Sequence, residues 1–410
     1  MLFFVIGLLG SEVEHAMQRI PGSKIYYKKE LGLETFIFPV IFFGFFALFA
    51  TQMGLENTLN TMMNTAYRLL IDTVLYLTAV CVIMGSVSAL LSEFGFVSLA
   101  NRLLQPLMKP LFGMPGAASL GIVTTFLSDN PAILALAEDN NFRRFFKKYQ
   151  FPALTNLGTA FGMGLIVCSY MYSLSPAMGQ PLGMAVIIGI IGAVIGSLIS
   201  TRLMLGFTKK IFGTKEKMVP DCQTMEMPPL HMRPVRAGGL GRRIIDAILE
   251  GGHGGVEMGL AIVPGVLVIC TLVMMLINGP SESGAYTGAA YEGIRLLPVL
   301  AAKVNFILKP LFGFSSPEAI GIPVTALGAA GASLSLAERL VHAKLVGPCD
   351  IAVFTAMCMC WSGYLSTHTS MMDSLDCKEL IGKAIFSHTI GGLCAGISAH
   401  WLFVLVSAVF

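Results

Sequence analysis

Long apolar runs alternate with short polar segments along most of this chain. A helix that crosses a membrane needs about 20 predominantly apolar residues. Seven runs reach or approach that length: residues 33–53, 69–91, 152–172, 181–203, 257–277, 350–369 and 384–409. The pattern therefore predicts a helical membrane protein with seven spans.

Two stretches of the chain repeat one another. Residues 109–138 read KPLFGMPGAASLGIVTTFLSDNPAILALAE and residues 309–338, 200 positions later, read KPLFGFSSPEAIGIPVTALGAAGASLSLAE, with 14 of 30 positions identical. Each copy is apolar and broken at its centre, by Ser-Asp-Asn-Pro from position 128 in the first and by Gly-Ala-Ala-Gly from position 328 in the second. Interrupted hydrophobic segments at matching positions of two halves indicate the binding site of a transporter.

The basic residues predict how these copies sit in the membrane. Arg102 and Lys109 precede the Ser-Asp-Asn-Pro interruption of the first copy, and four basic residues follow the copy between positions 143 and 148. Because Lys and Arg favour the cytoplasmic side, both ends of the copy are expected there. A segment that begins and ends on one side is a re-entrant hairpin, and such backbone is tolerated only where protein or a wet cavity surrounds it. We name the two copies hairpin one and hairpin two.

Counting spans from these orientations places the start of the first repeat outside and the start of the second inside, so the repeats are inverted. Whether residues 1–10 belong to an additional span stays open. The expected division is an N-terminal segment with the first span (1–66), repeat one (67–212, hairpin about 109–141), a cytoplasmic linker (213–243) and repeat two (244–410, hairpin about 309–341).

Composition narrows the class of protein. The 410 residues are 55% hydrophobic and 12% charged, whereas soluble proteins are about 25% charged. The net charge of +3 is small, so nothing indicates nucleic acid and none is expected as a partner. The nine cysteines lie mostly in apolar runs, and Cys358 and Cys360 lack partners at zinc spacing, so no metal site is expected.

Enzyme motifs are missing from the sequence: there is no GxSxG, HExxH or P-loop pattern. We therefore expect no enzyme and no ATP-driven pump. The expected setting is the inner cell membrane, crossed several times, with the lipid bilayer and a small-molecule solute as partners.

The order of surface helix, re-entrant hairpin, broken span and glycine-rich span occurs twice, from about residue 69 to the C-terminus. It resembles the concentrative nucleoside transporters and the wider nucleoside-recognition (Gate) domain superfamily, which includes the spore-maturation A/B proteins. The resemblance implies an all-α polytopic membrane protein with inverted repeats, each holding a re-entrant helical hairpin and broken helices. It also implies a homo-oligomer.

The resemblance extends to three short elements. Where the family has Gln-Thr-Glu-Ala-Pro in hairpin one, this chain has residues 127–131, so Asp129 takes the place of the acid and Leu127 that of the glutamine. Where the family has Asn-Glu in hairpin two, this chain has only Ala and Gly from position 329 to 331. The family's Asn-Phe-Ser matches Cys360-Trp361-Ser362, which makes Ser362 a candidate for solute binding.

Asp129 is the sharpest site candidate. A carboxylate near the bilayer midplane costs on the order of 2.5–3.5 kcal/mol, so a role in binding solute, sodium or a proton is expected. The alternative is a cap on the half-helix that follows it. Ser128 and Asn130 share the tip of hairpin one, where each either contacts the solute or caps the helix.

Other polar residues complete the candidate site. Thr125 either joins freed carbonyls in a sodium site or bonds back to its own helix. Asn156 and Thr159 begin the span after hairpin one. An asparagine in an apolar setting needs a hydrogen-bond partner, and the tip of hairpin one is the expected one. Ser333 and Ser335 either replace the polar pair missing from hairpin two or serve helix packing. His368 lies near the inner end of its span. There a histidine at the membrane interface, or one whose hydrogen bonds are all made, is favoured over a proton relay.

These observations predict a secondary transporter of a small polar solute, nucleoside-like or amino-acid- or peptide-like, that works by alternating access. Two hairpins would close on a site at the membrane midplane. No cofactor is expected, and sodium and proton coupling both stay open. The alternative is a non-transporting Gate-domain membrane protein with a role in assembly, sporulation or signalling.

Overall fold

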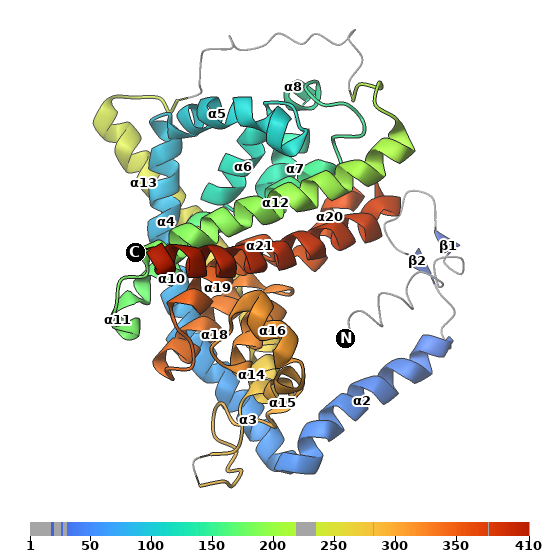
Figure 1. Cartoon of the computed structure of the whole chain (residues 1–410), viewed down its shortest axis with the longest axis vertical. Coiled ribbons are helices and arrows are strands. Elements are labelled where there is room, and N and C mark those ends of the chain that lie inside the picture. The colour runs from blue at the N-terminus through green and yellow to red at the C-terminus, as the bar shows by residue number, and fades with distance from the viewer. Residues whose placement is uncertain are drawn as a thin grey trace. The chain divides into compact units, whose positions relative to one another are not determined.

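The computed structural model of the chain is built almost entirely from helices (Figure 1). It describes residues 18–19, 26–27, 31–138, 140–218, 235–281, 283–375 and 377–409. Two regions named in the sequence predictions lie outside the described residues: residues 1–10, whose place in an additional span stays open, and residues 219–234 in the middle of the predicted linker. The chain forms two compact units, residues 1–59 and 60–410.

The first unit contains one long apolar helix. Strands β1 (Gln18–Arg19) and β2 (Tyr26–Tyr27) pair antiparallel, and α2 (Leu33–Met53) follows them. The helix ends at Gly54, whose φ of 80° is accessible to glycine without steric cost. Its 21 residues match the length of a membrane span. Helix α3 (Leu55–Arg68) begins in the same unit.

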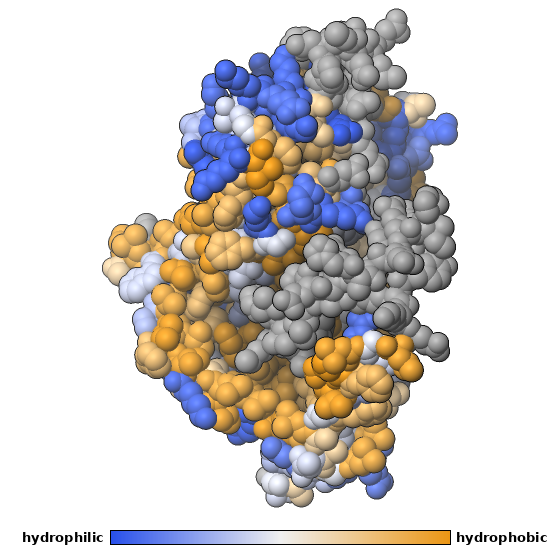
Figure 2. All heavy atoms as spheres, turned by 90° about the vertical axis from the view of Figure 1, so that its right-hand side faces the viewer, coloured by the Kyte–Doolittle hydropathy of each residue, from blue (hydrophilic) through white to orange (hydrophobic). Residues whose placement is uncertain are grey.

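Within the described residues, six helical stretches are long and apolar enough to cross a membrane: Leu33–Met53, Leu55–Glu93, Ala153–Met178, Gly183–Phe212, Leu240–Ile277 and Lys378–Val409. Each overlaps one of the predicted spans. Together they define a polytopic α-helical membrane protein. Figure 2 shows many hydrophobic side chains exposed on the face that it draws.

The sixth predicted span, 350–369, consists of two helices. Helix α19 (Pro348–Cys360) and helix α20 (Tyr364–Ser374) are separated by residues 361–363, which we name the central break. All residues of α19 from Asp350 to Cys360 are buried. The apolar run therefore reflects a position in the protein core.

A second break divides the span after hairpin one. Helix α9 (Ala153–Thr159) and helix α10 (Gly164–Ser173) flank residues 160–163, which we name the first break. Met163 has a φ of 54° and Gly363, 200 positions later, has a φ of 59°. Helix α9 packs against α20 and α10 packs against α19, so the two broken helices cross.

Both repeated stretches fold as helical hairpins. Hairpin one consists of α6 (Ala118–Leu127) and α7 (Pro131–Glu138), and hairpin two of η5 (Pro317–Ile320), α17 (Gly321–Ala326) and α18 (Ala330–His342). In each, a glycine of the first arm lies against the second arm: Gly121 against Ile133 and Gly321 against Leu336. Every arm is shorter than the roughly 20 residues of a membrane crossing.

The repeat relation holds at the level of single contacts. Gln150 accepts a hydrogen bond at Oε1 from the Lys147 backbone (3.1 Å) and donates from Nε2 to the Gly113 carbonyl (3.0 Å). Asp350, 200 positions later, accepts from the backbones of Gly347 (2.8 Å) and Ser315 (3.0 Å). In repeat two the side chain caps α19, in repeat one it closes the turn that precedes α9, and in both it bonds to the start of the hairpin.

Packing of the glycine-rich helices shows that the repeats are inverted. Helices α12 (Gly183–Phe212) and α21 (Ile381–Val409) lie side by side (Figure 1). Gly192 lies against Ala399, and Gly196 lies against Ala395 and Gly391, so the helices run antiparallel. Because α12 and α21 are equivalent elements of the two repeats, the repeats have opposite orientations. A Cβ on Gly196 would lie 2.5 Å from the Gly391 oxygen, so this close approach requires glycine.

Helices α4 (Leu75–Glu93) and α13 (Leu240–Ala261) pack antiparallel in the same way, with Gly85 against Gly251 and Gly255 against Cys81. The remaining helices are η2 (Leu69–Val74), α5 (Phe96–Leu107), η3 (Met108–Phe112), α8 (Asn140–Arg143), α11 (Ser175–Met178), η4 (Gly265–Cys270), α14 (Thr271–Ile277), α15 (Leu296–Lys303), α16 (Asn305–Phe312) and η6 (Lys378–Leu380).

Candidate functional site

The tip of hairpin one reaches the crossing of the two broken helices through Asn130. This side chain is 3% exposed, and its Nδ2 donates a hydrogen bond to the Ser362 carbonyl in the central break (2.8 Å). On another side lies Gly162 of the first break, where a Cβ would stand 2.1 Å from Asn130 Oδ1. Asn130 thus contacts both breaks at once.

Asn130 also carries an unused acceptor. Within the described part of the chain, its Oδ1 is buried and has no hydrogen-bond partner. Buried polar atoms are normally paired, because leaving one unpaired costs about 1–3 kcal/mol. The tip of hairpin one therefore presents a free acceptor at the centre of the fold.

The tip of hairpin two bonds to the same central break. The Gly363 backbone donates to the carbonyl of Ala326 at the end of α17 (3.1 Å), and a Cβ on Gly363 would lie 3.2 Å from the Gly328 oxygen. Residues 361–363 thus accept one hydrogen bond from hairpin one and donate one to hairpin two. The two tips meet through the polar backbone that a broken helix leaves free.

Asp129 and Ser128 lie at the outer part of the first tip. Asp129 is half-buried, and its Oδ1 accepts a hydrogen bond from the Asn130 backbone (2.7 Å), while Ser128 is exposed. The carboxylate thus bonds within the turn that precedes α7. The predicted ligand roles of Asp129 and Ser128 stay predictions.

Asn156 fastens α9 to two other helices. It is fully buried, and its Nδ2 donates to Ser200 Oγ on α12 (3.0 Å) and to the Ala384 carbonyl on α21 (3.0 Å). Both amide hydrogens are thereby occupied. A solute would meet Asn156 only through its oxygen, which accepts from Thr155 Oγ1 (3.3 Å).

The other candidates are buried and bonded within the protein. Thr125 donates to the Gly121 carbonyl of its own helix (2.7 Å), and Thr159 points its hydroxyl at Met371 Sδ (3.8 Å). Ser333 donates to the Ala330 carbonyl (2.6 Å) and Ser335 to the Gly331 carbonyl (3.0 Å). Of the predicted residues, the structure brings Asn130 and Ser362 into direct contact.

Three residues at this centre were missed by the sequence reasoning: Gly162, Ser200 and His388. His388 donates from Nε2 to the Cys360 carbonyl at the edge of the central break and bonds Ser200 through Nδ1 (3.2 Å). An ionisable residue inside an apolar span is a functional candidate by default, so His388 carried a readable signal. Gly162 and Ser200 carried none, because their roles depend on neighbours distant in sequence.

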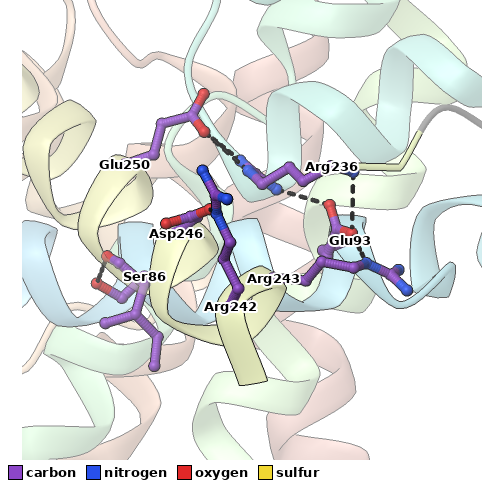
Figure 3. Close-up of polar contacts among 8 residues, drawn as sticks. Ser86, Glu93, Arg236, Arg242, Arg243, Asp246 and Glu250 are labelled. Carbon is purple, nitrogen blue, oxygen red and sulfur yellow. Dashed lines mark hydrogen bonds and ion pairs between the residues drawn. The ribbon is translucent and has the colours of Figure 1, made fainter. Parts of the chain in front are cut away.

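A separate charged cluster joins the ends of α4 and α13 (Figure 3). The carboxylate of Glu93 accepts hydrogen bonds from Arg236 Nη1 (2.7 Å) and Arg243 Nε (2.7 Å), and Arg236 also bonds Glu250. The Glu250 carboxylate and then that of Glu93 raise the pKa of the Arg236 guanidinium above its ordinary value. Arg236 belongs to the predicted linker, so the described end of that linker is tied to α4.

Replacing Glu93 with glutamine should loosen this cluster, because Glu93 is 4% exposed and two guanidinium groups lose its charge. We expect a lower melting temperature and faster tryptic cleavage after Arg236, both measured on purified protein. Glu257→Gln is the control, since Glu257 is exposed and pairs with His253 across 3.5 Å. Equal cleavage rates in the two variants would contradict the assigned role of Glu93.

Some solved structures are similar to this chain. The chain is similar to solved structures of CNTnw, a concentrative nucleoside transporter. For a variant in an outward-facing state the sequence identity is 16% over 80% of this chain and 75% of that chain, with a TM-score of 0.48. For the inward-facing substrate-bound state the values are 14%, 79%, 73% and 0.46. No protein-family model and no curated protein matches the chain.

Proposed function

We propose that the protein is a secondary transporter of a small polar solute in the inner cell membrane. The observation that carries the proposal is that the tips of two short hairpins both bond to the central break, through Asn130–Ser362 and Ala326–Gly363. Inverted repeats with broken helices at a shared centre are the architecture in which alternating access operates.

The hydrogen bonds at the tips suggest how access alternates. Withdrawing hairpin one breaks the bond from Asn130 to Ser362, and withdrawing hairpin two breaks the bond from Gly363 to Ala326. Each withdrawal leaves a buried polar group unpaired, which costs about 1–3 kcal/mol unless solute or water replaces the partner. A solute with both donors and acceptors lowers this cost, so it favours movement of a hairpin.

Asp129 and Asn130 are the proposed solute contacts on hairpin one, with Ser128 at the tip. Ser333 and Ser335 of hairpin two, with Asn156, Thr159 and Ser362 of the broken helices, are proposed to line the rest of the path. The coupling ion is proposed to be sodium or a proton, with Asp129 and Thr125 as its first candidates. A homo-oligomer is part of the proposal.

Asp129→Ala is expected to abolish solute-dependent stabilisation, because the carboxylate is the charged group at the tip. The measurement is thermal unfolding of purified protein, screened with nucleosides, amino acids and dipeptides, with and without sodium. A ligand at 100 times its Kd stabilises the folded state by about 2.7 kcal/mol, well within detection. Asp373→Ala is the control, since Asp373 is exposed and pairs with Lys378 at 2.8 Å.

The proposal fails if no class of solute raises the melting temperature and Asp129→Ala unfolds like the unaltered chain. That outcome would support the second candidate, a non-transporting membrane protein that acts in assembly or signalling. One observation favours this candidate: the tip of hairpin two carries only Ala329 and Ala330 between its glycines, so it offers a solute backbone groups alone.

A further inference from the structure

Two buried histidines lie beside the central break. His368 of α20 is 0% exposed and His388 of α21 is 1% exposed, and their ring centroids are 4.5 Å apart. His388 holds the carbonyl of Cys360, the last residue before the break. The pair is therefore connected to the backbone on which both hairpin tips are anchored.

The hydrogen bonds of His388 fix its tautomer. Its Nε2 faces the Cys360 carbonyl, so this nitrogen carries the proton and donates it. Its Nδ1 then accepts from Ser200 Oγ (3.2 Å), and Ser200 in turn accepts from Asn156 Nδ2 (3.0 Å). Both nitrogens of His388 are thereby satisfied as a neutral ring.

His368 differs in one nitrogen. Its Nδ1 faces the Tyr364 carbonyl (3.1 Å) and so carries the proton, which leaves a lone pair on Nε2. Of the residues that the structure describes, none supplies a hydrogen-bond partner to this Nε2. The expectation of an interfacial or satisfied histidine does not fit this side chain, because its position is fully buried and one nitrogen is unpaired.

We propose that Nε2 of His368 is a proton-binding position whose occupancy is coupled to release of the hairpin tips. The inference rests on the proposed function and names the coupling ion as a proton. The proton comes from bulk water, forms the Nε2–H bond and returns to water. Among the described residues, the titratable side chains whose rings face His368 are Tyr364 of α20 and His388 of α21, while the thiol of Cys360 bonds to the Ala193 carbonyl.

Coupling follows from what surrounds the pair. A proton on His368 places a positive charge on a ring whose centroid lies 4.5 Å from that of a second imidazole and 5.7 Å from that of Tyr364. A buried charge without a counter-charge is costly, so the protonated form favours a conformation in which water reaches the pair. If α21 moves away from the break to admit water, the bond from His388 to Cys360 of α19 is lost, which loosens the break that holds both tips.

Hydrogen exchange of the full-length protein in detergent tests this coupling. The readout is exchange at residues 361–363, corrected for the intrinsic rate, between about pH 8 and pH 5.5. We expect acidification to raise the corrected rate at least about fivefold, the lower end of typical coupling strengths. His253→Gln, at an exposed histidine of α13 whose side chain is 78% exposed, should keep this rise.

Two substitutions of His368 should remove the rise. His368→Asn keeps a donor near the position of Nδ1 and removes Nε2, and His368→Gln keeps a polar group near Nε2 that does not titrate. Two variants with different shapes guard against a simple folding defect, which thermal unfolding reveals. A flat profile in the unaltered chain, or a rise that persists in either folded variant, would overturn the assignment.

The outcome is separate from that of the proposed function. If a solute stabilises the protein while exchange at the break is independent of pH, the proton site is wrong and the transporter stands. If exchange depends on His368 while no solute binds, the proton site stands and the transporter fails.

Discussion

Replacing Gly162 with alanine is expected to displace the tip of hairpin one. A Cβ at this position would lie 2.1 Å from Oδ1 and 2.8 Å from Cγ of Asn130, closer than any real contact. Asn130 is buried and bonded to Ser362, so it has little room to move. Overpacking of this kind costs about 1–3 kcal/mol, and the effect is measured as a loss of thermal stability in detergent.

Gly206→Ala is the matched control, because Gly206 lies in helix α12 and a Cβ there would have nothing within 4 Å. An alanine in an open helical position should stabilise the protein by up to about 1 kcal/mol. Asn130→Ala removes the atoms that clash, so the double variant Asn130→Ala with Gly162→Ala should lose less stability than the sum of the single changes. Strict additivity would show that the two residues are not in contact.

The contact between Asn130 and Gly162 also shows which features of the fold could be predicted from the sequence and which could not. The repeated stretches predicted two hairpins because equal patterns fold alike, and their short arms in the structure agree. The crossing of the first and central breaks was not readable, because Asn130 meets Gly162 and Ser362 only after three separate elements come together. No local pattern records a neighbour that lies 232 residues away.

The weighting of the tip residues illustrates the same limit. From the sequence, Asp129 stood out because a carboxylate in an apolar segment is costly. In the structure the neighbouring Asn130 makes the buried bond, while Asp129 accepts a hydrogen bond from the backbone of that neighbour. The free-energy cost of burying polar side chains identifies the polar segment correctly. Only the fold decides which residue of that segment points inward.

Asn156 shows the same limit for the helices around the site. An asparagine in an apolar span had to find a partner, and the hairpin tip was the expected one. The structure instead pairs it with Ser200 and the Ala384 carbonyl, on the antiparallel helices α12 and α21. That close approach depends on glycines such as Gly196, whose packing partners a single sequence does not reveal.

Asp350→Ala is expected to destabilise the protein strongly, by about 3 kcal/mol, because several buried donors lose one charged acceptor. Asp350 is 0% exposed and accepts from the Gly347 backbone (2.8 Å), the Ser315 backbone (3.0 Å) and the Ser315 hydroxyl. These bonds cap α19 and hold the start of hairpin two. The measurement is the free energy of unfolding in mixed detergent micelles.

The equivalent position in repeat one provides the internal comparison. Gln150 is neutral and accepts from one backbone donor, Lys147, so Gln150→Ala should cost only about 1 kcal/mol. Asp350→Asn keeps the shape but presents an amide where donors converge, so its stability should fall between that of the unaltered chain and that of Asp350→Ala. If Gln150→Ala proves as costly as Asp350→Ala, then charge is not what distinguishes the two caps. In that case hairpin two would be held no more firmly than hairpin one. The two hairpins would then differ in the polarity of their tips and not in the strength of their attachment.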